Sequence, residues 1–481
     1  MELCHTSSDL GSVAIQKLGQ FIQEWRACWE TGTPDFERFE HELHEQVQRV
    51  ECEMLKEALS RYDVAAEQIV VSGKTYSQAL TSTETYLSAA GAVSVERHLY
   101  RPAGRGSRTI CPMELRAGVI GGYWTPRAAR QGAFAMAHLT GNDSEALFAE
   151  MEGMRPSRAS LDRLPKELSL HWESHREEWE AAMREQESWP SQAVVLALSV
   201  DGVTVRMKND EGHLQRDQPG KHSSGPLGQR EAGCATVVGY DAEGERLRTV
   251  RYGRMPERGK QTLRAQLAQE ASQILARQPS LRRVLLADGA ETNWGILAEA
   301  DRACGPAAQA SIAIVDFYHA CEHLKEGCDA AWGESTPRGN AEFERLKILL
   351  KEDEYGADRV IHMLKYHRGR SKGNQRKRLE TQLTYFRNQQ PRMHYAAYLR
   401  DNLPIASGVM EASCKTLVTQ RLKQSGMTWS RSGGQAILTL RSLIQSDRWD
   451  AAWELLRRDF QKIVSVRHRT PPGFIDLPLA A

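Results

Sequence analysis

Apolar residues in the first part of the chain repeat at helical spacing. Seven of them, from Phe36 through Val47 to Ala58, follow one another at intervals of three or four positions, which predicts a long amphipathic helix. The pattern covers only about three heptads, so we expect this helix to pack within its own domain rather than to form a dimeric coiled coil. Residues 1–91, the acidic helical N-terminal region, hold 7 Lys and Arg against 15 Asp and Glu.

From residue 92 the pattern changes, and a second region is predicted over 92–190. Alternating apolar residues over 93–99 predict a strand, which a turn at 102–106 and a return strand over 107–111 would complete as a β-hairpin. Three short helices and a charged fourth one follow, over 126–140, 144–152, 157–164 and 168–188.

The short helices of the second region favour DNA binding without deciding it. A Gly-containing turn between the last two of them is compatible with a helix-turn-helix, although three-helix pieces are also common in proteins of other functions. Residues 92–130 carry seven Arg against two Glu, and this excess favours a surface that faces DNA.

The strongest strand signal of the chain is the apolar run 193–200, which leads into Asp201-Gly202 and continues to Val205. Further strands, with helices before and between the last two, are predicted over 234–239, 247–252, 284–287 and 312–315. The order of these elements indicates a mixed α/β domain. Residues 207–230, polar and rich in Gly, His and Ser, are expected to form a loop.

The chain after the last predicted strand is helical in pattern. Residues 323–403 are expected to form an all-α insertion, and Pro404 separates it from a final helical stretch. Ser407 is a suitable N-cap for that stretch. Glu411 then falls in its opening turns, where the helix dipole favours an anion.

Three carboxylates occupy positions that a two-metal nuclease site would use. Asp201 and Asp288 follow strands, and Glu411 opens a late helix. Two Mg²⁺ ions about 3.5–4 Å apart need such hard oxygen ligands. Each residue also has an ordinary explanation, because Asp-Gly is a common turn and Glu411 could pair with Lys415 on an exposed helix.

A zinc-binding pattern overlaps this region. His319, Glu322 and His323 match the His-x-x-Glu-His motif of inverted zinc peptidases. Five residues are a weak signal, and Asp316 stands immediately before them. We therefore expect Asp316 and His319 to face the end of the sheet together, and give the peptidase interpretation little weight.

The overall charge of +1 hides a strongly basic segment. Residues 365–441 hold 15 Lys and Arg against three acidic residues. Aromatic residues are interleaved with these charges: Tyr366, Tyr385, Phe386, Tyr395, Tyr398 and Trp429. Cations can neutralise phosphates and aromatic rings can stack on bases, so this segment predicts a nucleic-acid-binding surface. Its candidate DNA-binding residues are Arg376, Lys377, Arg378, Lys415, Arg421 and Lys423.

Other compositional features point to the cytoplasm. The nine cysteines include no Cys-x-x-Cys pair, which suits reduced thiols. The start of the chain has no basic and apolar signal-peptide pattern. The run 193–200 is too short for a bilayer, so we expect no membrane partner.

Several strings together resemble the bacterial insertion-sequence transposases of the Asp-Asp-Glu class, and within them the Kra-type branch related to Mutator-like transposases. The matching strings are Ser199-Val-Asp201-Gly-Val, Leu286-Ala-Asp288-Gly-Ala-Glu-Thr-Asn-Trp294, Asp316-Phe-Tyr-His319-Ala-Cys-Glu-His-Leu324, Asn402-Leu-Pro-Ile-Ala-Ser-Gly-Val-Met-Glu411 and Lys415-Thr-Leu-Val-Thr-Gln-Arg-Leu-Lys423. Further strings begin at Cys111, Tyr123 and Pro156. The resemblance covers roughly residues 92–450, in the expected order of motifs.

The resemblance implies a ribonuclease-H-like α/β catalytic domain with an all-α insertion, preceded by mainly α-helical N-terminal regions. Its core would comprise 191–322 and 404–481, separated by the insertion 323–403. Asp201, Asp288 and Glu411 would form the catalytic and metal-binding triad, holding two Mg²⁺ ions, with Mn²⁺ as a substitute.

The resemblance also implies roles around the triad. Asp316 and His319 match the Asp-x-x-His motif of the Mutator-like group and, with Trp294, would handle DNA near the active site. The partners would be double-stranded DNA, both element ends and target, and further copies of the chain in a dimer or higher oligomer assembled on DNA. The protein would act at the bacterial nucleoid.

Two other functions remain open from the sequence. A transposase-derived, non-catalytic DNA-binding protein could retain the same residues. A metal-dependent nuclease could use the same site without strand transfer.

Overall fold

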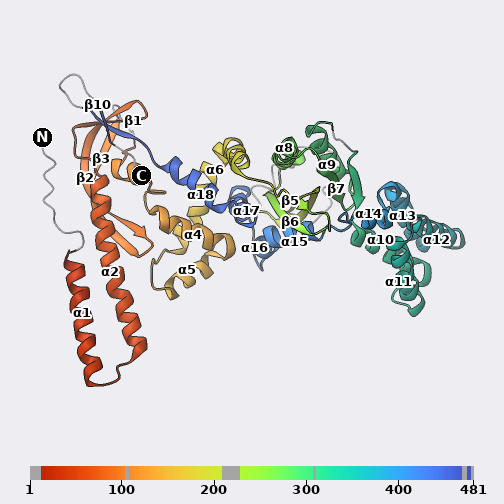
Figure 1. Ribbon diagram of the computed structural model, residues 1–481, viewed down its shortest axis with the longest axis horizontal. Helices are drawn as coiled ribbons and strands as arrows, with labels where there is room; N and C mark the ends of the chain where they lie inside the picture. Colours follow the sequence, from red (N-terminus) through yellow and green to blue (C-terminus); the bar gives the residue numbers. More distant parts are fainter. Residues whose placement is uncertain (1–11, 103–107, 209–227, 307–309, 468–473, 478–481) are drawn as a thin grey trace. The chain divides into compact units, whose positions relative to one another are not determined.

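The computed structural model describes residues 12–102, 108–208, 228–306, 310–467 and 474–477 (Figure 1). Their contacts divide the chain into two compact units, one drawn from 1–179 and 450–481 and the other from 180–449. Residues 450–481, which the sequence analysis grouped with the catalytic core, therefore belong with the N-terminal unit.

The first unit begins with two long helices that lie side by side, α1 (Ser12–Thr31) and α2 (Phe36–Tyr62) (Figure 1). The carboxylate of Asp35 caps α2 by accepting the amides of Glu37 and Arg38. The Phe39 ring of α2 packs against Phe21 and Trp25 of α1. The amphipathic helix predicted from Phe36 onward is confirmed.

A five-stranded antiparallel sheet follows, in the order β10-β9-β1-β2-β3. Its strands are β1 (Gln68–Val71), β2 (Lys74–Ser88), β3 (Gly91–Pro102), β9 (Val464–Arg467) and β10 (Phe474–Leu477). The sequence analysis expected no strand before residue 92, and this was wrong. Most of β2 is exposed and polar, so it lacks the apolar alternation that reveals a half-buried strand, although its threonines favour strand structure.

The predicted strand over 93–99 is confirmed within β3, but its partner is not the expected one. β3 pairs with β2 along its length, whereas only one bridge, Tyr100 to Ile110, joins it to the segment after the turn. The predicted turn falls largely on residues 103–107, which lie outside the described part of the chain.

The helices of the first unit are α3 (Pro112–Ala117), α4 (Pro126–His138), α5 (Gly141–Glu150), most of α6 (Arg158–Gln186) and α18 (Trp449–Phe460). Two helices predicted separately, over 157–164 and 168–188, are one continuous helix that contains Pro165. A proline inside a helix costs about 3 kcal/mol. The helix continues because Leu161, Leu164, Leu168 and Trp172 form one buried stripe at helical spacing.

The second unit is built on a mixed sheet in the order β6-β5-β4-β7-β8. Its strands are β4 (Val195–Arg206), β5 (Gln229–Tyr240), β6 (Arg246–Arg254), β7 (Arg282–Ala287) and β8 (Ile312–Val315). β4, β5 and β6 pair antiparallel, whereas β7 and β8 continue the sheet parallel to β4. The predicted mixed α/β domain is confirmed. Most of the predicted loop 207–230 lies outside the described residues.

Alternate residues of the central strand point to opposite faces of this sheet. Leu196 and Leu198 pack into one core with residues of α8 (Gln261–Arg277) and α9 (Glu291–Ala303). Val195 and Ala197 pack into another with residues of α10 (Phe317–Trp332). Helices on both faces therefore bury the strands.

The region predicted as an all-α insertion is helical. Between α10 and Glu411 the chain forms α11 (Pro337–Glu352), α12 (Gly356–Arg370), α13 (Gly373–Gln389) and α14 (Tyr395–Arg400), with a short 3-10 turn, η3 (Gln390–Arg392). It returns through α15 (Gly408–Ser413), a π-helical turn η4 (Cys414–Thr419), α16 (Gln420–Leu422) and α17 (Arg431–Gln445). In the part of the chain that the structure describes, no helix has the length and apolar content needed to cross a bilayer.

Candidate functional site

Asp201 on β4 and Asp288 directly after the neighbouring parallel strand β7 lie at the same level of the sheet. The register of β4 and β7 places Ser199 opposite Leu286, and each aspartate follows two residues later on its own chain. Both side chains are partly buried. The fold thus brings together two carboxylates that are 87 positions apart in the sequence.

Asp201 is a strand residue and not part of a turn. Asp201 and Gly202 pair with Cys234 and Gly233 of β5, and the pairing continues to Arg206. The turn interpretation of this Asp-Gly pair was therefore wrong. Asp288 does have a turn role, because its Oδ1 accepts the Ala290 amide at 3.0 Å and the Asn293 Nδ2 at 3.1 Å.

The environment of Asp201 opposes its negative charge. Burial raises the pKa of this carboxyl, and the nearby charge of Asp288 raises it further. Two donors act in the opposite direction: the Gly202 amide, 2.7 Å from Oδ1, and the Cys414 Sγ, 3.7 Å from Oδ2. The two aspartates are thus close enough to repel each other, which a bound cation would relieve.

Cys414 also brings the helix of Glu411 to this edge of the sheet. It follows Glu411 by three residues, at the start of the π-helical turn, and its thiol lies against Asp201. π-helical turns are frequent at functional sites. Glu411 itself is exposed, and no ion pair among the described residues joins it to Lys415, which leaves the ordinary Glu–Lys pair without support.

The start of the Glu411 helix is held from α10. Ser407 occupies the predicted N-cap position, but its side chain makes no capping bond. Its backbone amide instead donates to Oδ2 of Asp316, whose Oδ1 accepts the His319 amide at 2.7 Å. Asp316 is 5% exposed. Both of its carboxylate oxygens accept backbone amides inside the fold, and the side chain does not form part of the surface.

The residues present meet the requirements of a divalent cation only in part. The Asp201–Asp288 pair supplies adjacent hard oxygen ligands. Among the described residues, however, no three His, Cys, Asp or Glu side chains gather closely enough to hold a metal ion. The structure therefore joins two members of the predicted triad and places the third on a neighbouring helix.

Residues of the insertion contact the Asp288 turn, and sequence reasoning missed them. The Tyr385 hydroxyl donates to the Asp288 carbonyl at 3.3 Å, and Gln389 Nε2 donates to the Gly289 carbonyl at 3.0 Å. Burial raises the pKa of Tyr385, which keeps its hydroxyl protonated as a donor. Gly289 has φ +108°, with Tyr385 packed where a side chain would project, so only glycine fits this turn without strain.

The histidines of the zinc-like pattern belong to the same contact region. The His323 ring stacks on Tyr385 with centroids 3.6 Å apart, and its Nδ1 lies 2.7 Å from Gln382 Oε1. Burial lowers the pKa of His323 and favours its neutral form. His319 is partly exposed and pairs with Glu322 at 3.3 Å.

Trp294, the third residue expected to handle DNA, packs inside the second unit. Arg392 lies over its ring, 4.5 Å from the centroid. The side chain also contacts both cores that flank the sheet. In this structure Trp294 therefore joins α9 to the insertion.

The six candidate DNA-binding cations differ in their exposure. Arg376, Lys377, Lys415 and Lys423 are exposed. Arg378 is paired with Glu334 at 3.1 Å. Arg421 is only 3% exposed and lies 5.3 Å from the centroid of the Trp429 ring, so in this conformation its guanidinium is a packing group and does not reach a phosphate.

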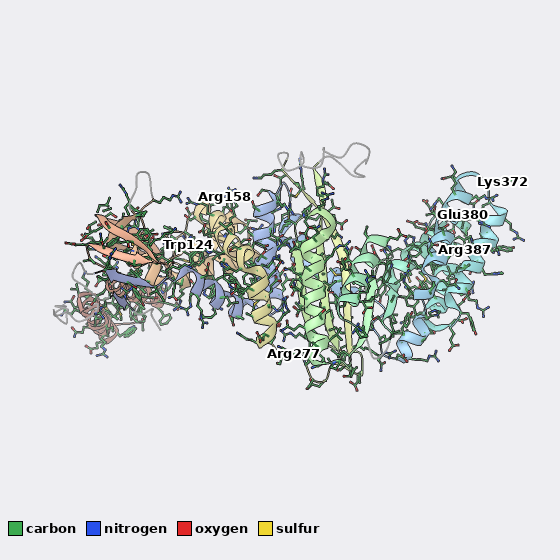
Figure 2. The ribbon with its side chains drawn as sticks, turned by 90° about the horizontal axis from the view of Figure 1, so that it is seen from above. Trp124, Arg158, Arg277, Lys372, Glu380 and Arg387 are labelled. Atoms are coloured by element: carbon green, nitrogen blue, oxygen red, sulfur yellow. The ribbon has the colours of Figure 1, made fainter. Side chains whose placement is uncertain are left out.

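Exposed cations gather around the turn between α12 and α13. Figure 2 shows Lys372 at the free end of the insertion, with Glu380 and Arg387 further along α13. Arg370 stacks on the exposed Tyr366 ring at 3.6 Å, an arrangement that presents a ring and a charge together. The exposed basic residues of this turn, which we call the insertion tip, are Lys365, Arg370, Lys372, Arg376 and Lys377.

Most of the aromatic residues interleaved with these charges are not available for stacking. Phe386, Tyr395 and Tyr398 are buried in the core between the insertion and the sheet. Their spacing reflects helix packing, which a one-dimensional pattern does not distinguish from a binding surface. Tyr366 is the member of the set that the structure leaves exposed on the tip.

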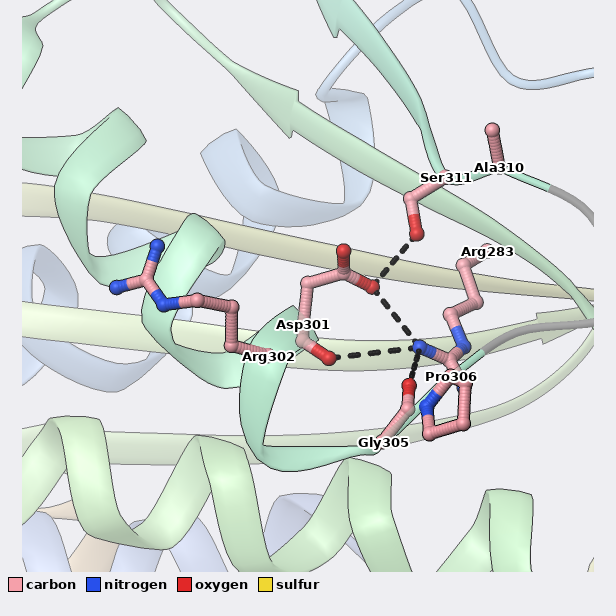
Figure 3. Close-up of a pocket in the computed structure, with 7 residues that line it drawn as sticks. All are labelled: Arg283, Asp301, Arg302, Gly305, Pro306, Ala310 and Ser311. Carbon is pink, nitrogen blue, oxygen red and sulfur yellow. Dashed lines mark hydrogen bonds and ion pairs between the residues drawn. The ribbon is translucent and has the colours of Figure 1, made fainter.

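A cavity of about 460 Å³ lies at the other end of β7, away from the carboxylates. Its lining residues are Arg283, Asp301, Arg302, Gly305, Pro306, Ala310 and Ser311 (Figure 3). Arg283 donates to the carbonyls of Cys304 and Gly305 and to Asp301 Oδ1, and Ser311 donates to the same oxygen. These bonds satisfy the end of α9 and give the cavity a structural explanation.

Comparison with known proteins adds no assignment to this geometry: no family model matches the chain, and no curated protein does.

Proposed function

We propose that this protein is a DNA transposase that binds the ends of an insertion sequence and catalyses phosphodiester hydrolysis and strand transfer. One observation carries the proposal: Asp201 within β4 and Asp288 directly after the parallel strand β7 lie side by side, next to the helix of Glu411. A partly buried pair of like charges is unfavourable without a partner cation, and active sites are where proteins retain such arrangements.

The architecture of the second unit supports a ribonuclease-H-like catalytic domain. Three antiparallel strands are followed by two strands parallel to the first, with helices on both faces. An all-α insertion separates the last strand from Glu411, as the resemblance to Asp-Asp-Glu transposases implies. Asp316 supports the same interpretation, because it fastens the two ends of the insertion together through His319 and Ser407.

Asp201, Asp288 and Glu411 would hold two Mg²⁺ ions, with Mn²⁺ as a substitute. Bound there, the ions would activate the attacking oxygen and stabilise the leaving oxygen at the cleaved phosphate. The chain orients the carboxylates: Gly202 and Cys414 hold Asp201, while Ala290 and Asn293 hold Asp288. Glu411, exposed on α15, is the third proposed ligand.

Exposed cations support DNA as the substrate. The insertion tip carries five of them. Helices α12 and α13 contain two acidic residues, Asp358 and Glu380, and Glu380 is paired with Arg368. Lys415 and Lys423, which follow Glu411 in the sequence, are exposed as well. Such groups neutralise phosphates without selecting a sequence, so we assign them to holding element ends and target DNA in an assembly of two or more copies.

The test is a cleavage assay on element-end DNA with Asp288→Asn and Glu411→Gln. Each substitution is expected to abolish end cleavage in Mg²⁺ and to leave end binding measurable, because it removes a metal ligand and no phosphate contact. Glu352→Gln, an exposed change on α11, is the control and should cleave normally. Cleavage by either site variant at the wild-type rate would refute the proposed triad.

Two further measurements separate transposition from the alternatives. A non-catalytic DNA-binding protein would bind a pre-nicked end and leave it unchanged with Mn²⁺. A simple nuclease would cut but yield no product joined to target DNA. The transposase is expected to yield joined products.

A further inference from the structure

The hairpin of α1 and α2 exposes an unusual number of large apolar side chains. Seven of them are between 40 and 68% exposed: Val13, Ile15, Ile22, Trp29, Phe36, Val47 and Met54. Val13 lies two positions before Ile15 and therefore on a different side of α1; the other six divide equally between the two helices. Single exposed apolar residues need no explanation, whereas a contiguous group marks an interaction surface.

The spacing places each set of three in one stripe. On α1 the three residues are seven positions apart, and on α2 the intervals are eleven and seven. At 100° per residue these intervals return to within about 20° of the starting direction. Each helix therefore carries a straight apolar stripe along its exposed surface.

Both stripes lie on the same face of the hairpin. On α1, Ile15 and Ile22 each come one position after a residue buried in the seam between the helices, Ala14 and Phe21. On α2, Val47 likewise comes one position after Gln46, which is partly buried. In a pair of antiparallel helices, the residue that follows a seam residue projects toward the same side of the pair on both helices. The six residues thus form three rungs, Trp29 with Phe36, Ile22 with Val47, and Ile15 with Met54, which we call the hairpin face.

The rest of the hairpin has partners. Phe21 and Trp25 pack against Phe39 in the seam. The other side of α2 packs on β3 and α3 through Leu59, with Cys52 and Leu55 beside it. Trp29 and Phe36 also touch Phe39 at the edge of the seam, with ring centroids 4.9 and 6.1 Å apart, yet they stay 48 and 68% exposed. The fold of one chain therefore leaves much of the hairpin face exposed to solvent.

The area of the hairpin face approaches that of a stable interface. Six large side chains at these exposures present on the order of 600 Å² together, the upper limit for the largest patch on a typical monomer and close to the 800 Å² per partner of a stable dimer. Two-helix layers are normally completed by packing on a further layer.

Charges at the rim make the face complementary to itself. Arg26 lies at the outer edge of α1 and Glu40 at the outer edge of α2, at similar heights along the hairpin. Both side chains are exposed, and no ion pair among the described residues involves them. A two-fold axis parallel to the helices would pack α1 of one copy against α2 of the other. Each rung would then meet the same rung of the second copy, and Arg26 would face Glu40 of the partner subunit.

We propose that the hairpin face is the interface through which two copies of this chain associate in the absence of DNA. The occupant is a second copy, in a four-helix arrangement, because area, rung spacing and rim charge all match when the face meets itself. This inference is independent of the proposed catalytic function, since it concerns only α1 and α2.

The test is the molar mass of the full-length protein in solution without DNA or metal, measured by light scattering across a concentration series. The wild type is expected to show the mass of two chains. Ile22→Glu combined with Val47→Glu places two charges in the middle rung and should raise the dissociation constant about 100-fold or more. Gln20→Glu combined with Ser60→Glu adds the same charge at exposed positions on the opposite face and should leave the dimer intact.

A charge exchange distinguishes this two-fold interface from non-specific adhesion. Arg26→Glu alone should weaken the dimer, and Arg26→Glu with Glu40→Arg should restore it. Both variants change only exposed side chains, so they decide the question even if the double glutamate variant fails to fold. A wild type that stays a single chain throughout, association into larger species without a two-chain plateau, or a dimer that ignores these substitutions would overturn the proposal.

Discussion

The buried carboxylate of Asp316 accepts a hydrogen bond from the backbone amide of Ser407, 91 positions further along the chain. The same carboxylate caps α10 through the amide of His319. The point where the chain leaves the sheet and the point where it returns with Glu411 are therefore tied to one side chain. The insertion between them is held at its base, and with it the position of the Glu411 helix beside Asp201.

We expect Asp316→Ala to destabilise the protein by about 2–4 kcal/mol, because it removes an N-cap and leaves two partly buried amides without their acceptor. The free energy of unfolding of the second unit, measured with urea, tests this. Asp35→Ala is the matched control: Asp35 caps α2 in the same way but is exposed, so about 1 kcal/mol is expected. Equal losses in the two variants would show that Asp316 does no more than cap a helix.

We expect Asp201→Asn to stabilise the protein at neutral pH. Burial and the Asp288 charge raise the pKa of Asp201 above its ordinary 3.8, so the native state binds this proton more tightly than the unfolded chain. Stability from this group is thus complete at pH below 3.8 and is lost as pH rises through the native pKa. Asparagine carries no charge and avoids this loss, so the free energy of unfolding at pH 7 should rise by about 0.5–2 kcal/mol. Gains of this size are common when an unfavourable functional residue is replaced.

The pH dependence of unfolding provides the check on Asp201. The difference between Asp201→Asn and wild type should shrink as the pH falls and vanish below about 3.8, where the wild-type carboxyl is protonated in both states. Glu243→Gln, an exposed change in the β5–β6 turn, should show no comparable difference. Added Mg²⁺ should narrow the gap at pH 7, since a bound cation stabilises only the wild-type pair. A difference that is constant with pH would contradict the electrostatic explanation.

Arg376→Gln combined with Lys377→Gln is expected to weaken DNA binding mainly at low salt. The slope of log affinity against log salt should become less steep by about 2, because each lost phosphate contact releases about one counterion fewer. Binding to specific and random sequences should fall alike. Lys351 is an exposed cation of α11 away from the insertion tip, and Lys351→Gln should leave the slope unchanged. If Lys351→Gln lowered the slope as well, the weaker binding would reflect the lower net charge of the protein and not the loss of phosphate contacts at the tip.

Arg421 and Lys423, two residues apart, should respond in opposite ways. Arg421→Ala is expected to cost about 1–3 kcal/mol of stability, since it removes a buried guanidinium that packs on Trp429. The salt slope of DNA binding should not change. Lys423→Ala should leave stability within about 0.5 kcal/mol and reduce the slope by about 1. The reverse pattern would mean that Arg421 turns outward to meet DNA.

Local signals in the sequence were sufficient where one residue and its neighbours decide the conformation. The apolar run before Asp201 predicted β4, and the period of the residues after Phe36 predicted α2. These signals failed where packing overrides local preference. Pro165 lies inside α6 because a stripe of buried leucines crosses it, and β2 has no apolar alternation because most of it is exposed.

The candidate site shows the same division. Sequence motifs selected Asp201, Asp288 and Glu411, and counting charges selected the basic segment that contains the insertion tip. Neither could show that Tyr385 and Gln389 hold the Asp288 turn, or that Cys414 lies against Asp201. No signal in the sequence marks these contacts, because each joins residues about 100 positions apart or more.

The sequence by itself determined which residues alternate, repeat or carry charge, and hence the mixed α/β core, the helical insertion and the candidate carboxylates. Only the tertiary structure decided which of them meet: it paired Asp201 with Asp288, buried Arg421 and several aromatic residues, and left the hairpin face exposed. The physical reason is that periodicity and capping act over a few residues along the chain. Strand register, burial and helix packing instead depend on contacts between distant segments, which form only when the whole chain folds.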